Sequence, residues 1–456
     1  MFYLFAAFFL SIMNLTSIKI LLPEIMTDLS VGLNWLTWVV NAYTLPLAVL
    51  TPVAGRIADL YGPRRFFIVG IFILGLGSLL CGIAFSLPWL IGGRLIQALG
   101  AALLVPSSLT ILLSRSTVET RGRLLGIWGG IGAMGAVIGP VFSGYLTDFF
   151  SWRGSFLAVA VPAFLIAYAT WRTKFARQKT ASLEDNRNTG FDALGTTLLM
   201  SAIASVLMGL TLLPDWGWQN NWIRMSFFAF MLLMYAFYRV ERIARNPLLD
   251  PLLMREPRFK LGLLVAFLEQ FVIAGTLFVM PIFFGTVQGH AAAATALLLI
   301  PAALSVALVS PIGGRLSDHF GPGLPITVGM LMRTISFIML SRITSGTEYL
   351  YIAGGLALNG LGFALTSTPA LHAVLSTVDP RQHGIVSGVH NMMRFTGAAA
   401  GTTASGIILY ALIPASFDSI AGPIPGFHEA FMLGAAVCLP GIAAGIYLAR
   451  QRLINA

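Results

Sequence analysis

The most constraining feature of this sequence is a succession of long apolar segments joined by short polar connections. A helix needs about 20 apolar residues to cross a hydrocarbon core of about 30 Å. None of the segments shows the short alternating pattern of a membrane β-barrel strand. Fourteen segments are long enough to span a membrane, at residues 2–22, 32–53, 66–85, 88–113, 124–146, 154–172, 192–213, 222–240, 260–284, 292–312, 326–343, 349–372, 384–411 and 428–449. The sequence therefore predicts an all-α membrane protein with 14 transmembrane helices.

The composition supports the same class. Of all residues, 57% are hydrophobic and only 10% are charged, whereas soluble domains carry about a quarter charged residues. The first segment has no basic n-region and no small-residue cleavage site, so we interpret it as a membrane helix and not as a signal peptide. Cys81 and Cys438 lie in separate apolar segments, which indicates buried thiols and neither a disulfide framework nor a metal site.

Lysine and arginine residues indicate the orientation, because cytoplasmic loops are enriched in them. With the N-terminus in the cytoplasm, most of the 28 basic residues fall on the cytoplasmic side, and Arg153, Arg224 and Arg342 fall outside. This bias explains the formal net charge of +10, so no nucleic-acid partner is predicted. An even number of spans places both termini in the cytoplasm, and we expect a multi-pass protein of the cell membrane.

One short stretch occurs twice in the chain. Residues 51–63 read TPVAGRIADLYGP and residues 310–322 read SPIGGRLSDHFGP. Both copies fall in cytoplasmic turns, which indicates a parallel internal repeat of the kind on which secondary transporters are built. The position of the second copy implies two spans (192–240) inserted between two halves. We expect a six-helix bundle at 1–172, a linker with two inserted transmembrane helices at 173–259, and a second six-helix bundle at 260–456.

The residues of the repeated turn fit a role in conformational switching. Each copy has an aspartate one helical turn after a glycine, and a glycine that supplies the positive φ of a tight turn. The carboxylate can accept hydrogen bonds from a neighbouring helix N-terminus or from an arginine. A bond that forms in one state and breaks in another would act as a latch, while an ordinary capped turn is the alternative for each copy alone. The residues concerned are Gly55, Asp59 and Gly62 in the first copy and Gly314, Asp318 and Gly321 in the second.

Several stretches together resemble a known family. GRIADLYGPRR (55–65) includes the basic pair Arg64 and Arg65, and LIGGRLIQALGAA (90–102) includes Arg94 and Gln97. With GAVIGPVFSG (135–144), WLTWVVNAYTL (35–45) and FDALGTTLL (191–199), they are similar to motifs of the major facilitator superfamily. Within it the chain resembles the fourteen-helix drug:proton antiporters (EmrB/QacA-like). The resemblance implies a major facilitator fold of two six-helix bundles plus two inserted helices.

The span at 124–146 has a face nearly free of side chains. Small residues let membrane helices approach closely, and Pro140 kinks the span within this face. Tight packing alone is one interpretation. The resemblance implies a further role, because the antiporter motif at Gly135, Gly139, Pro140 and Gly144 seals the resting cavity against leakage and favours export over uptake. The glycines of this face are Gly126, Gly129, Gly130, Gly132, Gly135, Gly139 and Gly144.

Ionisable residues inside a membrane are costly and are functional candidates by default. Glu269 is the one acid among them and lies nine residues beyond Lys260, which places it about 14 Å deep at 1.5 Å per residue. By resemblance its span lines the cavity. We predict that Glu269 carries the transported proton, with the alternative that an arginine neutralises it structurally. The ionisable residues inside the predicted spans are Lys19, Arg94, Glu269, Arg333 and Arg394.

The remaining membrane charges are bases. Arg94 and Asn14 lie at a similar depth, so we expect them to meet across the cavity. Relatives often have aspartate in place of Asn14, and its absence concentrates proton coupling on Glu269. Lys19 lies near the outer end of its span, where it either lines the cavity or snorkels toward the headgroups. The predicted substrate-cavity residues are Asn14, Lys19, Arg94, Gln97 and Gln270.

Two arginines stand apart from this cavity set. Arg394 matches a recurrent family arginine and is expected to be structural. Arg333 lies on a span that is peripheral in the family, and no role is predicted for it.

These features predict a secondary active transporter that exports small amphiphilic compounds in exchange for protons by alternating access. Because four bases accompany one acid in the spans, an exporter of one specific neutral or anionic metabolite or lipid-like compound is the alternative, ahead of an uptake symporter. The connections carry no paired histidine or cysteine motif, so no enzyme activity, cofactor or metal is predicted. The expected partners are a small-molecule substrate, protons and the lipid bilayer, and the oligomeric state is left open.

Overall fold

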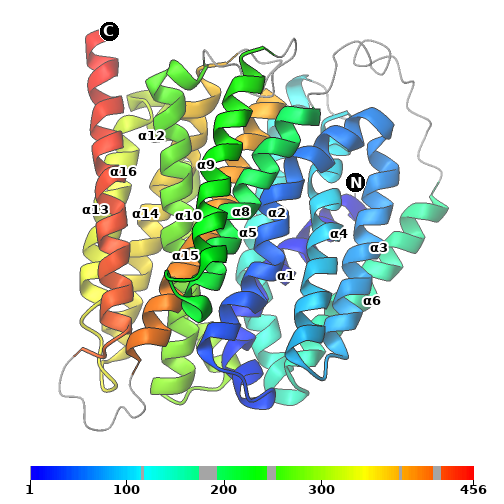
Figure 1. Cartoon of the computed structure of the whole chain (residues 1–456), viewed down its shortest axis with the longest axis vertical. Coiled ribbons are helices and arrows are strands. Elements are labelled where there is room, and N and C mark those ends of the chain that lie inside the picture. Colours follow the sequence, from blue (N-terminus) through cyan, green and yellow to red (C-terminus); the bar gives the residue numbers. More distant parts are fainter. Residues whose placement is uncertain are drawn as a thin grey trace.

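The helices of this protein run side by side along one common direction (Figure 1). The computed structural model describes residues 2–114, 118–173, 193–243, 253–378, 383–413 and 423–455, and regular structure in these ranges is entirely helical. The long helices are α1 (Phe2–Asp28), α2 (Leu33–Tyr61), α3 (Pro63–Gly82), α4 (Leu87–Ser114), α5 (Val118–Phe149), α6 (Trp152–Arg172), α8 (Ala193–Trp216), α9 (Asn221–Glu241), α10 (Pro257–Ile282), α12 (Ile300–Phe320), α13 (Gly323–Leu340), α14 (Tyr349–Leu375), α15 (His383–Leu412) and α16 (Phe427–Asn455). Three short elements are η1 (Leu253–Arg255), η2 (Phe283–Val287) and α11 (Ala292–Leu298).

The helices have the length and composition of membrane spans. Within the described ranges, 12 helical segments are long and apolar enough to cross a membrane, and α2 adds a shorter apolar stretch, Trp35–Thr51. The prediction of a multi-pass helical membrane protein is therefore confirmed. The predicted span 292–312 lies within one candidate membrane span, Ala292–Phe320, in which the α-helical assignment breaks at Leu299 between α11 and α12. Pro301 follows this break in the first turn of α12, where a helix tolerates proline.

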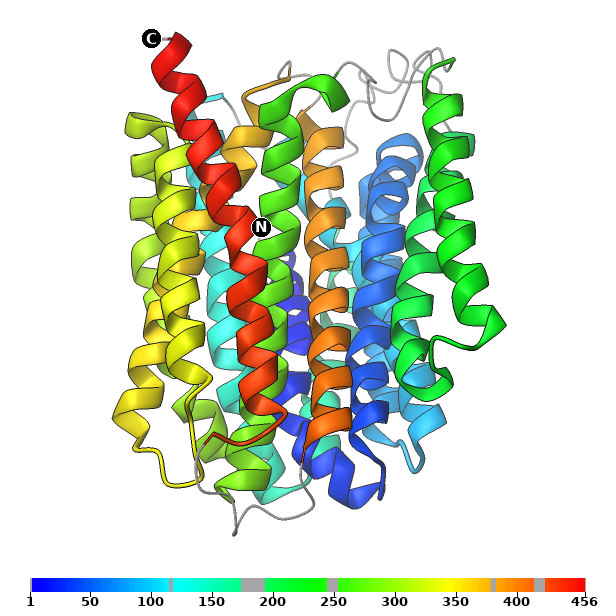
Figure 2. The ribbon, with the colours of Figure 1, turned by 60° about the vertical axis from the view of Figure 1, so that its left-hand side comes forward.

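The long helices form two groups with the same packing pattern. In the first group α3 packs against α4 and α6, α1 against α5, and α2 against α4. In the second group α13 packs against α14 and α16, α10 against α15, and α12 against α14. The groups meet where α2 packs against α15 and where α5 packs against α11. The pair α8 and α9 lies at the margin of the molecule, with α8 against α2 and α15 (Figure 2).

Two helix crossings repeat the same close approach. A Cβ atom at Gly70 in α3 would lie 2.8 Å from the carbonyl oxygen of Gly100 in α4. In the second group, a Cβ atom at Gly329 in α13 would lie 2.6 Å from the carbonyl oxygen of Gly362 in α14. Because only glycine lets two helix backbones come this close, the internal similarity extends beyond the repeated turn into the helices that follow it.

Candidate substrate and proton site

The first cluster of buried polar groups surrounds Arg94 on α4. Its guanidinium is fully buried. The Nη1 atom donates to Gln97 Oε1 at 2.8 Å and to Asn14 Oδ1 at 3.5 Å, and Nε donates to the carbonyl oxygen of Val39 at 3.2 Å. The ring of Tyr43 lies over the guanidinium at 4.4 Å. The structure therefore places Asn14 and Arg94 side by side, and all the acceptors of this guanidinium are neutral.

Gln97 extends this cluster across three helices. Its Nε2 atom donates to Asn14 Oδ1 on α1 at 3.2 Å and to Ser78 Oγ on α3 at 2.8 Å. In contrast, the Nη2 atom of Arg94, the Nδ2 atom of Asn14 and the Oγ atom of Ser17 are buried and have no hydrogen-bond partner in the described part of the chain. The cluster thus ends in donor groups that remain available to a further acceptor.

The second cluster surrounds Glu269 on α10, whose side chain is 0% exposed. Its Oε1 atom lies 3.4 Å from Nε of Arg394 and accepts a hydrogen bond from Ser367 Oγ at 3.2 Å. The Oε2 atom has no hydrogen-bond partner among the described residues. The carboxyl group is therefore held through one oxygen and leaves the other available to a proton.

Arg333 on α13 is also part of this second cluster. Its guanidinium is fully buried, with Nε donating to Asn359 Oδ1 at 3.1 Å and Nη2 donating to the backbone carbonyl of Glu269 at 3.1 Å. Asn359 in turn donates to Thr276 Oγ1 at 3.2 Å. No role was predicted for Arg333, and the structure shows that its side chain points into the bundle and bonds to the backbone that carries Glu269. Its position at depth in an apolar segment was the available signal, but depth does not reveal which way a side chain points.

The two clusters share a motif that the sequence analysis did not use. Residues 92–100 read GGRLIQALG and residues 354–362 read GGLALNGLG, which aligns Gln97 on α4 with Asn359 on α14. Each amide accepts a hydrogen bond from a buried guanidinium, from Arg94 in one group and from Arg333 in the other. Each group of helices thus holds a buried amide–arginine pair at the matching position of this motif.

The glycine face of α5 packs against α1 and α11. A Cβ atom at Gly139 would lie 3.0 Å from Met13 Cα, and one at Gly135 would lie 3.0 Å from the carbonyl oxygen of Phe9. A Cβ atom at Gly144 would lie 2.7 Å from the carbonyl oxygen of Ala292 in α11. Pro140 lies within α5, and the surroundings of Gly126, Gly129 and Gly130 lie outside the described side chains. This face therefore joins two elements of the first group and also contacts the second.

A carboxylate strengthens the contact between α5 and α11. The two oxygens of Asp148 accept hydrogen bonds from the backbone N–H groups of Ala292 and Ala293, each at 3.1 Å. These N–H groups begin α11 and have no partner within the helix, so a carboxylate is the favoured cap. The two groups of helices are thus held together at this end of the molecule.

The glycines of the repeated turns have the predicted backbone conformation, with φ of 101° at Gly62 and 77° at Gly321. Arg64 donates to the carbonyl oxygens of Thr170 and Trp171, which caps the end of α6. The side chain of Asp59 and the surroundings of Gly55 lie outside what the structure describes, so the latch in the first copy stays a prediction.

The second copy of the turn makes a different contact. Ser317 Oγ lies 2.7 Å from His372 Nδ1 on α14, and Asp318 Oδ1 lies 4.0 Å from the same nitrogen. Gly314 borders Thr368 of α14 at van der Waals distance, and Arg65, in the first copy, is exposed.

Two further predicted cavity residues lie on the helices that carry the clusters. Lys19 is half-buried on α1, and Gln270 is half-buried next to Glu269 on α10. Their assignment to the substrate cavity stays a prediction.

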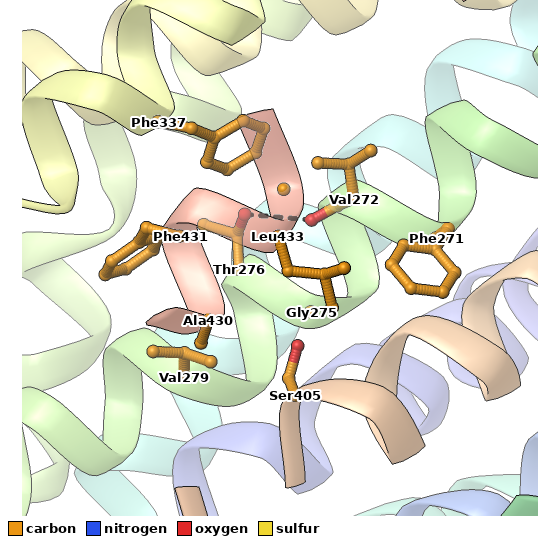
Figure 3. Close-up of a pocket in the computed structure, with 11 residues that line it drawn as sticks. Phe271, Val272, Gly275, Thr276, Val279, Phe337, Ser405, Ala430, Phe431 and Leu433 are labelled. Carbon is orange, nitrogen blue, oxygen red and sulfur yellow. Dashed lines mark hydrogen bonds between the residues drawn. The ribbon is translucent and has the colours of Figure 1, made fainter. Parts of the chain in front are cut away.

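A separate crevice lies between α10, α13, α15 and α16 (Figure 3). It is a narrow space of about 10 Å³, and Ser405 and Thr276 are its only hydroxyl-bearing lining residues in the described chain. The rest of the wall is apolar, formed by Phe271, Val272, Gly275, Val279, Phe337, Ala430, Phe431, Leu433 and Gly434. Thr276 also accepts the hydrogen bond from Asn359, so the crevice borders the second polar cluster.

The structure is that of a helical membrane protein with two polar clusters buried among its membrane spans. The family model of the Major Facilitator Superfamily matches residues 4–402, and the chain belongs to this superfamily. It is therefore a member of a transporter family and not of an enzyme family.

Several relatives of this chain are named as resistance or export proteins. The chain is 28% identical over 411 residues to "Multidrug resistance protein Stp" of Mycobacterium tuberculosis (strain CDC 1551 / Oshkosh), covering 90% of this chain and 75% of the relative. It is 26% identical over 448 residues to "Methylenomycin A resistance protein" of Bacillus subtilis (strain 168), covering 97% and 92%. It is 27% identical over 395 residues to "Tetracenomycin C resistance and export protein" of Streptomyces glaucescens, covering 86% and 72%.

Solved structures agree on the fold. A bacterial homolog to the human lysosomal transporter Spinster, in an inward-facing and unoccupied conformation, superposes with a TM-score of 0.69 at 16% identity. The match covers 99% of this chain and 96% of that chain. At this identity the similarity establishes the fold alone.

Proposed function

We propose that this protein is a secondary active transporter that exports small amphiphilic compounds in exchange for protons by alternating access. The similarity to resistance and export proteins supports the direction and the kind of cargo. The observation that carries the proton coupling is the environment of Glu269, a buried carboxyl group with one oxygen near Arg394 and the other unpaired.

This environment suits a group that is charged in one state and neutral in another. Burial away from water favours the neutral form of a carboxyl group, while a nearby guanidinium favours the charged form. Arg394 has a side chain that is 32% exposed, whereas Glu269 is 0% exposed. When Glu269 takes up a proton, the charge attraction between its carboxyl group and Arg394 is lost. Proton uptake is thereby linked to a change in the charge that the site presents.

The packing supports an architecture of two six-helix bundles plus two inserted helices. The bundles are residues 1–172 and 260–456, and α8 and α9 belong to the inserted segment 173–259. The repeated packing pattern and the marginal position of α8 and α9 support this division. It is the arrangement of the fourteen-helix drug:proton antiporters, and we place both termini in the cytoplasm of a cell-membrane protein.

Alternating access needs a contact between the bundles that opens and closes. The cap that Asp148 forms on α11 and the close approach of Gly144 to Ala292 hold the bundles together at one end of the molecule. With the N-terminus in the cytoplasm, α5 ends on the external side. In our proposal the described conformation is therefore closed to the outside, and export requires this contact to break.

The proposal is tested by transport in proteoliposomes with an imposed pH gradient. A panel of radiolabelled compounds should include cationic dyes, neutral antibiotics and aromatic carboxylates. We expect accumulation of at least one class against its gradient when protons flow in the opposite direction, and collapse of that accumulation by a protonophore. Accumulation that persists in the presence of the protonophore would contradict proton exchange.

A second candidate is an exporter of one specific neutral or anionic compound. Arg94 favours it, because its fully buried guanidinium has no carboxylate oxygen within 4.0 Å among the described residues. It differs from the first candidate in the breadth of the compounds transported, so the same panel separates the two.

A further inference from the structure

Three buried donor atoms on α1 and α4 have no hydrogen-bond partner in the described part of the chain. They are Nη2 of Arg94, Nδ2 of Asn14 and Oγ of Ser17. Arg94 and Asn14 touch through Nη1 and Oδ1, and Ser17 is one helical turn from Asn14 on the same buried side of α1. A buried donor without an acceptor is unfavourable, so three of them in one place indicate that an acceptor is missing.

The same place has an excess of positive charge. Arg94 is 0% exposed and, among the described residues, has no carboxylate oxygen within the 4.0 Å of an ion pair. A guanidinium does not lose its proton in a protein, so the charge stays. Lys19 lies five residues beyond Asn14, about 7.5 Å farther along the helix axis. The nearest acid that follows on α1, Glu24, is exposed.

The second group of helices contains an acid near its arginines. Arg394 lies 3.4 Å from the carboxylate of Glu269, and Arg333 donates to the backbone carbonyl of the same residue, although its Nη1 atom, like Nη2 of Arg94, has no hydrogen-bond partner among the described residues. The first group has no such acid beside Arg94 in the described chain, and its neutral acceptors and the Tyr43 ring offset the charge only in part. The missing acceptor is therefore expected to be an anion.

We infer that the cluster of Arg94, Asn14, Ser17 and Lys19 binds the anionic group of the exported compound, and that this group is a carboxylate. The inference rests on the proposed function, since it names the substrate class of that transporter. Arg94 and Lys19 supply charge, while Asn14 and Ser17 donate hydrogen bonds. A cationic group cannot accept from these donors, and an uncharged acceptor provides no negative charge for Arg94, so the cluster selects against both.

The chain offers a minimal substitution that tests this inference. Asn14→Asp changes one nitrogen to an oxygen and places a carboxylate beside Arg94, where it acts as a built-in counter-ion. If the cluster awaits an anion, the new carboxylate competes with the ligand. Because it also pairs a buried charge, it raises the thermal stability of the unliganded protein. A purely structural cluster predicts no loss of ligand binding.

The test measures binding of three matched probes to the full-length purified protein in nanodiscs by calorimetry. The probes are 1-naphthoate, 1-naphthamide and 1-naphthylmethylammonium, which share one apolar group. We expect the native protein to bind naphthoate at least about tenfold more tightly than the other two, as a charge-assisted contact allows. Asn14→Asp and Arg94→Gln should weaken naphthoate binding by at least about tenfold, and Arg94→Lys should weaken it less than Arg94→Gln does. The control Arg342→Gln, at an exposed arginine, should bind the three probes with the affinities of the native protein.

Several results would overturn the inference. One is equal affinity of the native protein for the three probes. Another is unchanged naphthoate affinity in Asn14→Asp with a normal unfolding temperature. A third is a rise in the unfolding temperature with phosphate or chloride alone that equals the rise with naphthoate. Because binding is measured without a gradient, the result is independent of proton coupling. Naphthoate binding without uphill transport would contradict the proposed function alone, and uphill transport restricted to cations would contradict the inference alone.

Discussion

The Nε atom of Arg394 on α15 lies 3.4 Å from Oε1 of Glu269 on α10, and the arginine is partly exposed while the glutamate is fully buried. The pair thus spans the boundary between the packed interior and a more open space. The backbone that carries Glu269 is fixed by Arg333, which donates to its carbonyl oxygen. A rigid carboxyl group beside a cation with room to move is the arrangement that proton-linked switching needs.

The first prediction concerns the support of this site by Asn359. Its side chain accepts from Arg333 and donates to Thr276, so Asn359→Leu leaves a buried guanidinium and a buried hydroxyl without these partners. We expect the free energy of unfolding to fall by about 2 kcal/mol, measured by denaturation in mixed micelles. As a control, Asn221→Leu at an exposed position should leave stability within about 0.5 kcal/mol of the native value. An equal effect of the two substitutions would show that the Asn359 contacts do not support the cluster.

A second prediction concerns the bare face of α5. A side chain at Gly139 meets Met13 Cα and Thr16 Oγ1 at 3.0 Å, so Gly139→Leu forces α1 and α5 apart. We expect this variant to insert into the membrane but to lose transport or to leak protons, as a pH-sensitive dye inside proteoliposomes reports. The neighbouring Ile138 is 41% exposed, and Ile138→Phe should retain coupled transport. Tight coupling in Gly139→Leu would remove the sealing role of this face.

A third prediction concerns the contact between Asp148 and α11. Asp148→Ala removes two charge-assisted hydrogen bonds, each worth about 1.5 kcal/mol or more, so the end that they hold should open more often. We expect spin labels at Phe150 and Gln288 to show a larger share of long distances than in the native protein. Glu348→Ala at an exposed acid should not change the distances. An unchanged distribution in Asp148→Ala would mean that packing alone holds this end.

The helical spans were predictable because the width of a bilayer fixes their length, and every predicted span overlaps a described helix. The positive φ at Gly62 and Gly321 was predictable for a similar reason, since a tight turn between packed helices requires it. Depth along a helix, counted in residues, also placed Asn14 near Arg94. These features follow from segment length, turn geometry and position along the chain.

Other features depend on which way a side chain points around its helix, and counting residues does not give that angle. Arg333 was assigned no role because its helix was expected to be peripheral, yet its guanidinium reaches α10 and α14. The pairing of Glu269 with Arg394 in particular depends on the packing of α10 against α15. The interruption of the helix at Leu299, between α11 and α12, was not predicted because the residues on both sides are equally apolar.

The central claim is that Glu269 couples export to protons, and the most direct measurement is transport by Glu269→Gln in proteoliposomes under an imposed pH gradient. Glutamine keeps the shape of the protonated carboxyl group but cannot release a proton. We predict that this variant fails to accumulate substrate against its gradient while it still exchanges labelled for unlabelled substrate across the membrane, and that the control Glu348→Gln does both. Undiminished uphill transport by Glu269→Gln would contradict the account and place the coupling elsewhere.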